Sequence, residues 1–291
     1  MGGAPHQSNP VPPLLLVDGH NLLWGATFGF PAAVLSRDKT RNLTGLFAFF
    51  ALLRVAVRDE VPAGPPEVIV VFDGQFGSAG RQAADAGYKA QRPADEAALA
   101  PIQFLPDVKQ GLDTCRIAWV EIEHAEADDV IATLVAATPS PRPVLIMSRD
   151  QDYYQLVDDS RIRVLNTKNR AGNRLIDAAA VHRRYGVTPA QWPDFRALAG
   201  DPADNIPGVR GIGATTAANL LAGGLTLDEL LDSGRLAGGR GRAVLDQWDN
   251  VLKWRDMIRL RTNLVLPRRP HGTASRGLPA PRDVVEQLGR W

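Results

Sequence analysis

The chain has 291 residues, 45% of them hydrophobic, which is enough to bury a large core and excludes disorder of the whole chain. Its 33 basic and 32 acidic residues give a net charge of only +1, so any bound polyanion would need a local cluster of basic groups. The single cysteine, Cys115, excludes an intrachain disulfide, and no apolar run reaches the roughly 20 residues that span a membrane.

The chain opens with residues 1–13, which are rich in Gly and Pro, lack apolar periodicity and are expected to form a disordered tail. No signal-peptide pattern is visible there, which together with the lone cysteine predicts a cytoplasmic protein without a membrane role. Short apolar runs typical of buried parallel strands follow, and they alternate with helix-like stretches such as Thr44–Val57 and Asp128–Ala137. The predicted strands are Leu14–Val17, Val68–Phe72, Ile117–Ile122, Val144–Met147 and Ile162–Leu165.

This alternation predicts an α/β domain over residues 14–186, with a central, mostly parallel sheet flanked by helices. From about Val187 the chain becomes rich in Gly and Ala, with glycine-containing loops around Gly208–Gly213 and Gly238–Gly241. We therefore expect a smaller helical region over residues 187–291. The stretch after Pro267 mixes Pro, Gly and Arg and is expected to be loosely ordered.

Acidic side chains follow three of the predicted strands at the point where each strand ends. Asp18 ends the first strand, Asp73 ends the second, and Asp150 and Asp152 come directly after the fourth. The carboxyl ends of strands in an open α/β sheet form the edge where ligand sites are built. We therefore expect these four carboxylates on one rim of the sheet.

Two other segments supply further acids. Glu126 and Asp128 follow the third strand, and on a regular helix they would lie roughly 200° apart, so Glu126 is expected before the helix or in a distorted first turn. Asp201 and Asp204 are distant in sequence, and only folding could bring them to the rim. Any one acid could instead start a turn or cap a helix, and for Asp129 this interpretation is the better one.

Many ionised carboxylates can share such a small region only if cations offset their repulsion or their pKa values rise steeply. Oxygen ligands favour Mg²⁺ or Mn²⁺, and two such ions about 4 Å apart can activate water and stabilise a leaving oxygen. The predicted reaction is metal-assisted phosphodiester hydrolysis. The candidate metal ligands are Asp18, Asp73, Glu126, Asp128, Asp150, Asp152, Asp201 and Asp204.

A glycine-rich turn, residues 208–213, has the form of a helix-hairpin-helix loop. Gly208, Gly211 and Gly213 would let the backbone approach a phosphate, and the following helix would direct its free N–H groups to the same place. This predicts DNA contact that does not depend on base sequence. Such turns also occur in proteins that never bind DNA, so the prediction depends on the neighbouring acids.

A second candidate DNA-binding element is the segment 81–92, which follows the Asp73 strand. Lys89 and Arg92 would share one face if the segment were helical. Together with Arg81 and Tyr88, they could hold the scissile phosphate and stack on an unpaired base. A solvated basic face is the alternative.

In this order, the segments Val17–His20, Val71–Asp73, Tyr88–Ala90, Glu126–Val130, Asp150–Asp152 and Gly200–Gly213 resemble the 5′-3′ exonuclease domain of bacterial DNA polymerase I and the related flap endonucleases. The resemblance implies a PIN-like 5′ nuclease fold with a C-terminal helix-hairpin-helix region that holds K⁺. It also implies a helical gateway over about residues 75–112, in which Lys89 and Arg92 act on the substrate. Arg81 matches the family less well.

The implied substrate is DNA with a 5′ flap, a frayed end or a single-stranded 5′ end, including RNA-primed DNA. The implied protein is a monomeric bacterial nuclease of replication and repair, with two or more metal ions. Nothing after residue 267 resembles a polymerase, which predicts a free-standing nuclease.

Two positions depart from the family pattern. Gly25 stands where many relatives carry an arginine near the substrate phosphate, and Gln151 replaces a lysine common between the paired aspartates. Both departures could lower activity or shift substrate preference. Two alternatives therefore stay open, a non-catalytic DNA-junction binder and a metal-dependent ribonuclease.

Overall fold

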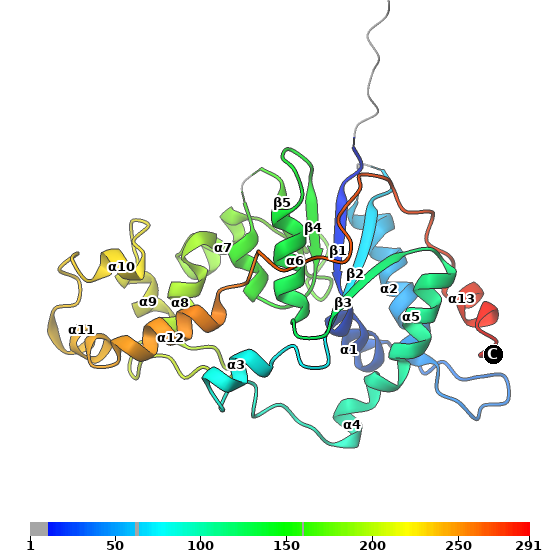
Figure 1. Ribbon diagram of the computed structural model, residues 1–291, viewed down its shortest axis with the longest axis horizontal. Helices are drawn as coiled ribbons and strands as arrows, with labels where there is room; N and C mark the ends of the chain where they lie inside the picture. Colours follow the sequence, from blue (N-terminus) through cyan, green and yellow to red (C-terminus); the bar gives the residue numbers. More distant parts are fainter. Residues whose placement is uncertain (1–10, 62–63, 159) are drawn as a thin grey trace, which may run out of the picture.

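The computed structural model describes residues 11–61, 64–158 and 160–291 (Figure 1). Most of the tail predicted over residues 1–13 lies outside these residues. Its last residues are held in place, because Arg142 Nε donates to the Pro12 carbonyl at 2.8 Å and the Glu67 amide donates to the Pro13 carbonyl at 2.9 Å.

A six-stranded sheet in the order β3-β2-β1-β4-β5-β6 forms the centre of the molecule. Its strands are β1 (Leu14–Asp18), β2 (Glu67–Asp73), β3 (Ala118–Ile122), β4 (Val144–Met147), β5 (Ile162–Leu165) and β6 (Leu175–Ile176). All neighbouring pairs are parallel except β5 and β6. The predicted parallel sheet is confirmed. The sequence did not reveal β6, because two residues are too short to show a period.

Alternate residues of the central strands supply two cores. Leu14 and Leu16 of β1 pack into one cluster, and Leu15 and Val17 pack into the other. This is the two-residue period of a strand that is buried on both faces. The first cluster extends into the helical region, and the second lies beneath the N-terminal helices.

Helices cover both faces of the sheet. The second cluster is covered by α1 (Gly19–Gly29), α2 (Thr44–Glu60) and α5 (Leu105–Thr114), and the first by α6 (Ala127–Ala136). Short elements complete this domain, namely α3 (Ala79–Ala84), α4 (Glu96–Leu99) and the 3-10 helices η1 (Ala100–Phe104) and η2 (Asp152–Leu156). Among the described residues, no helix combines the length and apolar character needed to cross a membrane.

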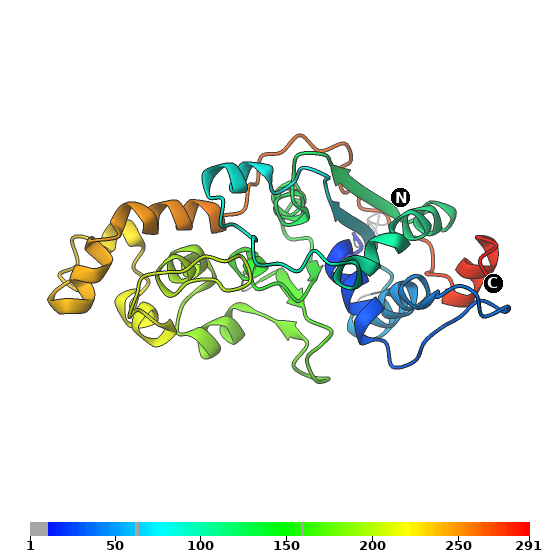
Figure 2. The ribbon, with the colours of Figure 1, turned by 90° about the horizontal axis from the view of Figure 1, so that it is seen from below.

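The remaining helices, except the last, form an arm that extends away from the sheet in both ribbon views (Figures 1 and 2). They are α7 (Ala178–Tyr185), η3 (Pro189–Gln191), α8 (Trp192–Ala199), α9 (Ala214–Leu220), α10 (Leu227–Leu230), α11 (Gly238–Leu245) and α12 (Trp248–Ile258). The arm is joined to the sheet by a shared core, in which α8 packs against both η2 and α12.

The C-terminal segment returns to the α/β domain. The Ser275 amide donates to the Pro66 carbonyl at 2.9 Å, and Ser275 Oγ accepts from the Val68 amide at 2.9 Å. The last helix, α13 (Pro281–Gln287), packs on α2 and buries Val284 and Val285 completely. The expectation of a loosely ordered end to the helical region is therefore wrong, because these apolar residues complete the core beneath α2.

Candidate active site

The carboxylate of Asp18 is fixed at the junction of β1 and α1. Its Oδ1 caps α1 by accepting from the Asn21 amide at 3.0 Å. Its Oδ2 accepts from Ser148 Oγ at 2.9 Å and from the Tyr153 hydroxyl at 3.3 Å. Burial, followed by repulsion from Asp73, raises the pKa of Asp18 to about 7. Asp18 is therefore a buried member of a cluster of acidic side chains.

Asp73, at the end of β2, joins that strand to the start of α6. Its Oδ1 accepts from the Ala127 amide at 2.7 Å. His20 Nδ1 accepts from the Asp73 backbone N–H at 3.0 Å and lies 3.5 Å from Asp73 Oδ2. Burial lowers the pKa of His20, which favours the neutral ring that this acceptor role requires.

Glu126 and Asp128 lie at the N-terminus of α6. Glu126 is the cap residue, with extended backbone angles (φ −75°, ψ 153°), so of the two predicted positions the structure shows the one before the helix. Its carboxylate forms ion pairs with Arg81 and Lys89. Burial raises the pKa of Asp128 well above its usual range, although Arg81 Nη1 lies 3.7 Å away.

Asp150 and Asp152 lie in the turn that follows β4. The Asp152 amide donates to Asp150 Oδ1 at 3.0 Å. The Asp152 carboxylate is buried, and repulsion from Asp150, Asp204 and Asp201 adds to this burial in raising its pKa well above the usual value. Its Oδ1 has no hydrogen-bond partner within the described part of the chain. An acceptor buried in this way suits a cation.

The loop between α8 and α9 brings Asp201 and Asp204 to the same rim. Asp201 Oδ2 accepts from Arg196 Nε at 3.0 Å. Asp204 Oδ1 accepts from Arg92 Nη2 at 2.9 Å, and its Oδ2 accepts from the Tyr88 hydroxyl at 3.0 Å. The folded chain therefore assembles acids from both regions, and basic side chains of the protein neutralise several of them.

The donor set fits a hard divalent cation in its chemistry, because every candidate ligand offers carboxylate oxygen. As the side chains stand, however, no group of three or more metal-ligating residues in the described ranges is close enough to hold an ion. In this arrangement Arg81 and Lys89 pair with Glu126, and Arg92 pairs with Asp204, so cations of the protein itself occupy these two carboxylates.

Asp129 has a structural role, as the sequence indicated. Its carboxylate is fully buried and accepts from Arg81 Nη2 at 2.9 Å and from Arg261 Nε and the Arg261 amide at 2.8 Å each. It thus ties α6 to α3 and to the segment after α12.

The segment 81–92 is not one helix. The helix α3 ends at Ala84, where Asp85 Oδ1 accepts from the Gly87 amide at 2.9 Å and replaces helical hydrogen bonding with a local turn. Lys89 then adopts a left-handed conformation with φ 56°. The shared helical face expected for Lys89 and Arg92 is therefore wrong.

Two of the predicted DNA contacts point inward. The Tyr88 side chain is buried, and its hydroxyl donates to Glu126 and Asp204, so its ring cannot stack on a base in this arrangement. Arg81 is 12% exposed and is engaged by Glu126 and by the Met257 carbonyl. Contacts with the buried acids fix the orientation of both side chains, and the local sequence does not indicate these contacts.

Lys89 and Arg92 also face the acids, but they differ in exposure. Burial alone would lower the pKa of Lys89, yet attraction by Asp204 and Glu126 outweighs it and raises this pKa. Arg92 remains 53% exposed while it pairs with Asp204. Arg92 is therefore the more accessible of the two predicted catalytic cations.

The three glycines of the 208–213 turn have different reasons for being glycine. Gly208 has φ 65°, and a Cβ there would collide with the backbone of Gly200. Gly211 has φ 85°, in open space. Gly213 precedes α9 with an ordinary φ of −88°, and a Cβ there would meet nothing within 4 Å. Packing requires Gly208, and the backbone turn favours glycine at position 211.

The sequence did not identify four side chains that hold the acids. His20 and Ser148 each lie two residues from a predicted metal ligand, Asp18 and Asp150, and this proximity in the sequence could have identified them. Tyr153 and Arg196 reach Asp18 and Asp201 from η2 and α8, and no local pattern indicates that direction.

Two families that together cover nearly the whole chain match this sequence. The 5′-3′ exonuclease N-terminal resolvase-like domain matches residues 13–186, and the 5′-3′ exonuclease C-terminal SAM fold matches residues 187–278. A 5′-3′ exonuclease from Streptomyces coelicolor is 38% identical over 221 residues, which cover 72% of this chain and 71% of that protein. A thermostable DNA polymerase I from Thermus aquaticus is 37% identical over 259 residues, 87% of this chain but only 29% of the polymerase.

Solved structures share the fold at low sequence identity. A flap endonuclease of bacteriophage T5, in a pseudo-enzyme-product complex with DNA and metal ions, has a TM-score of 0.66 and 20% identity, covering 95% of this chain and 93% of its own. Human GEN1 in complex with Holliday junction DNA has a TM-score of 0.60 and 12% identity, covering 96% of this chain and 68% of its own. With both of its domains matched in order, the chain belongs to the 5′-3′ exonuclease family.

Proposed function

We propose that this protein is a divalent-metal-dependent, structure-specific 5′ nuclease that hydrolyses DNA phosphodiesters. The observation that carries this proposal is the convergence of acids from three strand ends, one helix start and a distant loop on one rim. Among them, Asp152 has a buried oxygen without a partner in the described chain. Membership of the exonuclease family supports the same activity.

The resemblance to the 5′ nucleases implies two groups of metal ligands. Asp18, Asp73, Glu126, Asp128 and Asp150 would hold one Mg²⁺ or Mn²⁺, and Asp152, Asp201 and Asp204 a second, with some ligands shared. When bound, such ions activate water and stabilise the leaving oxygen of the phosphodiester.

The basic residues of the gateway have a second role in this proposal. Lys89 and Arg81 neutralise Glu126, and Arg92 neutralises Asp204, so the chain itself supplies counter-charges for these two acids. Ions that bind these carboxylates release the side chains of Lys89 and Arg92. Both can then donate to the oxygens of the scissile phosphate, a role that suits Arg92 in particular because half of its side chain is already exposed.

The arm supplies the duplex-binding surface of the proposed enzyme. Gly211 and Gly213 have open space above them, so a phosphate backbone can approach the turn before α9. We include a K⁺ ion bound at residues 208–213 in the proposal. We also propose that the protein acts as a cytoplasmic monomer on 5′ flaps, frayed ends and single-stranded 5′ ends, RNA-primed DNA among them.

A cleavage assay tests the proposal. Purified protein is incubated with a 5′-labelled flap duplex and Mg²⁺ or Mn²⁺, with and without EDTA, beside Asp150→Ala. We expect incision near the junction that EDTA and the substitution both abolish, while DNA binding by the variant persists. Tight binding without incision by the unaltered protein would instead support the non-catalytic junction binder. Cleavage retained by Asp150→Ala would contradict the assignment of the acids.

A further inference from the structure

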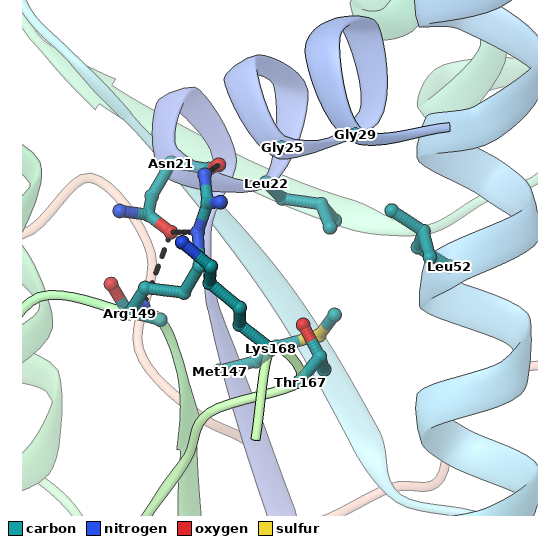
Figure 3. Close-up of a pocket in the computed structure, with 10 residues that line it drawn as sticks. Asn21, Leu22, Gly25, Gly29, Leu52, Met147, Arg149, Thr167 and Lys168 are labelled. Carbon is teal, nitrogen blue, oxygen red and sulfur yellow. Dashed lines mark hydrogen bonds between the residues drawn. The ribbon is translucent and has the colours of Figure 1, made fainter. Parts of the chain in front are cut away.

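An open pocket adjoins the acidic rim between α1 and the turn that follows β5 (Figure 3). The rim and the pocket share a wall, since Ser148 lines the pocket and donates to Asp18, and Arg149 directly precedes Asp150. The other polar or small residues that line the pocket are Asn21, Gly25, Gly29, Arg149, Thr167 and Lys168.

Arg149 is held in the pocket by neutral acceptors. Its backbone N–H and its Nε donate to Asn21 Oδ1 at 3.1 and 3.2 Å, and its Nη2 donates to the Asn21 carbonyl at 3.1 Å. Figure 3 shows the guanidinium lying against α1, with Lys168 also reaching toward that helix. The side chain is thus fixed in one orientation, which lowers the entropy cost of binding a further group.

The charges of this pocket differ from those of the neighbouring rim. Arg81, Lys89 and Arg92 all form ion pairs with acids. In the described part of the chain, no carboxylate forms a salt bridge with Arg149 or Lys168, although both line the same pocket. The pocket therefore presents two uncompensated positive charges beside a site of opposite sign.

Gly25 makes room for the guanidinium. A Cβ at this position would lie 3.0 Å from Arg149 Nη2 and 3.2 Å from Arg149 Cζ. One turn further along α1, a Cβ at Gly29 would meet nothing within 4 Å. Glycine is unfavourable inside a helix, so these two positions weaken α1 while they leave its pocket-facing side open. The arrangement favours a ligand that approaches the helix backbone closely.

We propose that Arg149 and Lys168 bind a phosphate of the DNA strand next to the phosphate that is cleaved at the rim. This inference rests on the proposed function. Guanidinium groups bind phosphate oxygens through paired hydrogen bonds, and an ammonium adds a point charge. The ligand is either an internal phosphodiester or a terminal 5′-phosphate, since both present the same oxygens. Arg149 thereby sets which bond of the strand reaches the acids.

Single-turnover cleavage and DNA binding in EDTA test the two residues. We expect Arg149→Gln to lower the cleavage efficiency by about 10-fold or more and to weaken binding, with a smaller effect for Lys168→Gln. Arg163→Gln is the matched control, because Arg163 is exposed on β5 outside the pocket, and it should behave as the unaltered protein does. Thermal unfolding of each variant establishes that it folds.

Altered substrates show whether a phosphate is the group that is bound. Neutral methylphosphonate linkages are placed one at a time on either side of the cleaved bond, and 5′-hydroxyl ends replace 5′-phosphates. One of these changes should lower the cleavage efficiency of the unaltered protein as much as Arg149→Gln does. On that substrate, Arg149→Gln should lower the efficiency no further. A methylphosphonate effect identifies an internal phosphodiester, and a 5′-hydroxyl effect identifies a terminal phosphate. If Arg149→Gln lowers the cleavage efficiency by the same factor on every altered substrate, the proposal is overturned.

Moving the guanidinium to α1 provides a second test. Arg149→Ala empties the space beside Gly25, and Gly25→Arg in the same chain returns a guanidinium from the helix. We expect this double variant to recover most of the activity that Arg149→Ala loses. A double variant no better than Arg149→Ala overturns the assignment. If the unaltered protein does not cleave at all, the proposed function fails, whereas binding in EDTA still reports on the phosphate pocket.

Discussion

Asp152 carries a buried carboxylate that the surrounding chain does not stabilise. Its Oδ1 lacks a partner in the described residues, and burial together with repulsion from Asp150 and Asp204 raises its pKa. Other acids of the rim are neutralised, for example Asp201 by Arg196. Ionisation of Asp152 therefore opposes folding, which is typical of a residue kept for function.

We predict that Asp152→Asn stabilises the protein in EDTA by about 1 kcal/mol, because the neutral amide removes the like-charge repulsion. When folding raises the pKa of a carboxylate, the free energy of unfolding of the protein falls as pH rises from the ordinary pKa toward the raised one. The advantage of the Asp152→Asn variant over its parent should therefore grow with rising pH. Thermal unfolding across pH measures this, and the exposed Asp232→Asn serves as the control. A variant less stable than its parent at high pH would contradict the prediction.

At the scale of elements, the glycines of the turn between α8 and α9 differ in what surrounds them. Gly208 lies against the backbone of Gly200 at the end of α8, whereas Gly213 faces open space. The same residue type thus occupies one position that packing constrains and one that packing leaves open. The motif alone does not distinguish them, because the distinction depends on how α8 approaches the turn.

We predict that Gly208→Ala lowers the free energy of unfolding by about 2 kcal/mol or more, since Ala must adopt a positive φ and also displace backbone. Gly213→Ala should change stability by less than about 0.5 kcal/mol, because its φ is ordinary and its Cβ has room. Denaturant unfolding of both variants checks this. Equal losses would show that packing does not decide the role of Gly208.

At the scale of the whole molecule, the C-terminal segment is bound to the start of β2 at Glu67. Glu67 is 2% exposed and accepts from Arg142 Nη2 at 2.6 Å, from the His271 amide at 3.0 Å and from the Gly272 amide at 2.9 Å. Burial alone would raise the pKa of Glu67, but these donors outweigh it and lower this pKa. One carboxylate therefore links residues about 200 positions apart in the sequence.

We predict that Glu67→Gln costs about 3 kcal/mol near pH 7, because it leaves the buried Arg142 without its counter-charge. A carboxylate with a lowered pKa stabilises the fold above the ordinary glutamate value, about 4.3, and loses this contribution as pH falls through the lowered pKa. The difference between variant and parent should thus shrink below about pH 4. Urea unfolding at several pH values measures it. A difference that does not change with pH would argue against ionic stabilisation.

The sequence by itself determined the sheet and the rim. Apolar runs marked five strands, and acids at the ends of three of them had to meet, because parallel strands share one carboxyl edge. Helical geometry limited Glu126 to a place before α6 or in a distorted first turn, and the structure decided for the first.

Only the tertiary structure decided which side chains face which way across that rim. Tyr88 and Arg81 turn inward to the acids, Arg149 fills the space beside Gly25, and the C-terminal segment returns to β2. Local periodicity reports which residues avoid water, whereas these contacts join residues distant in sequence. Their partners are therefore fixed by packing and by the electrostatics of the assembled fold.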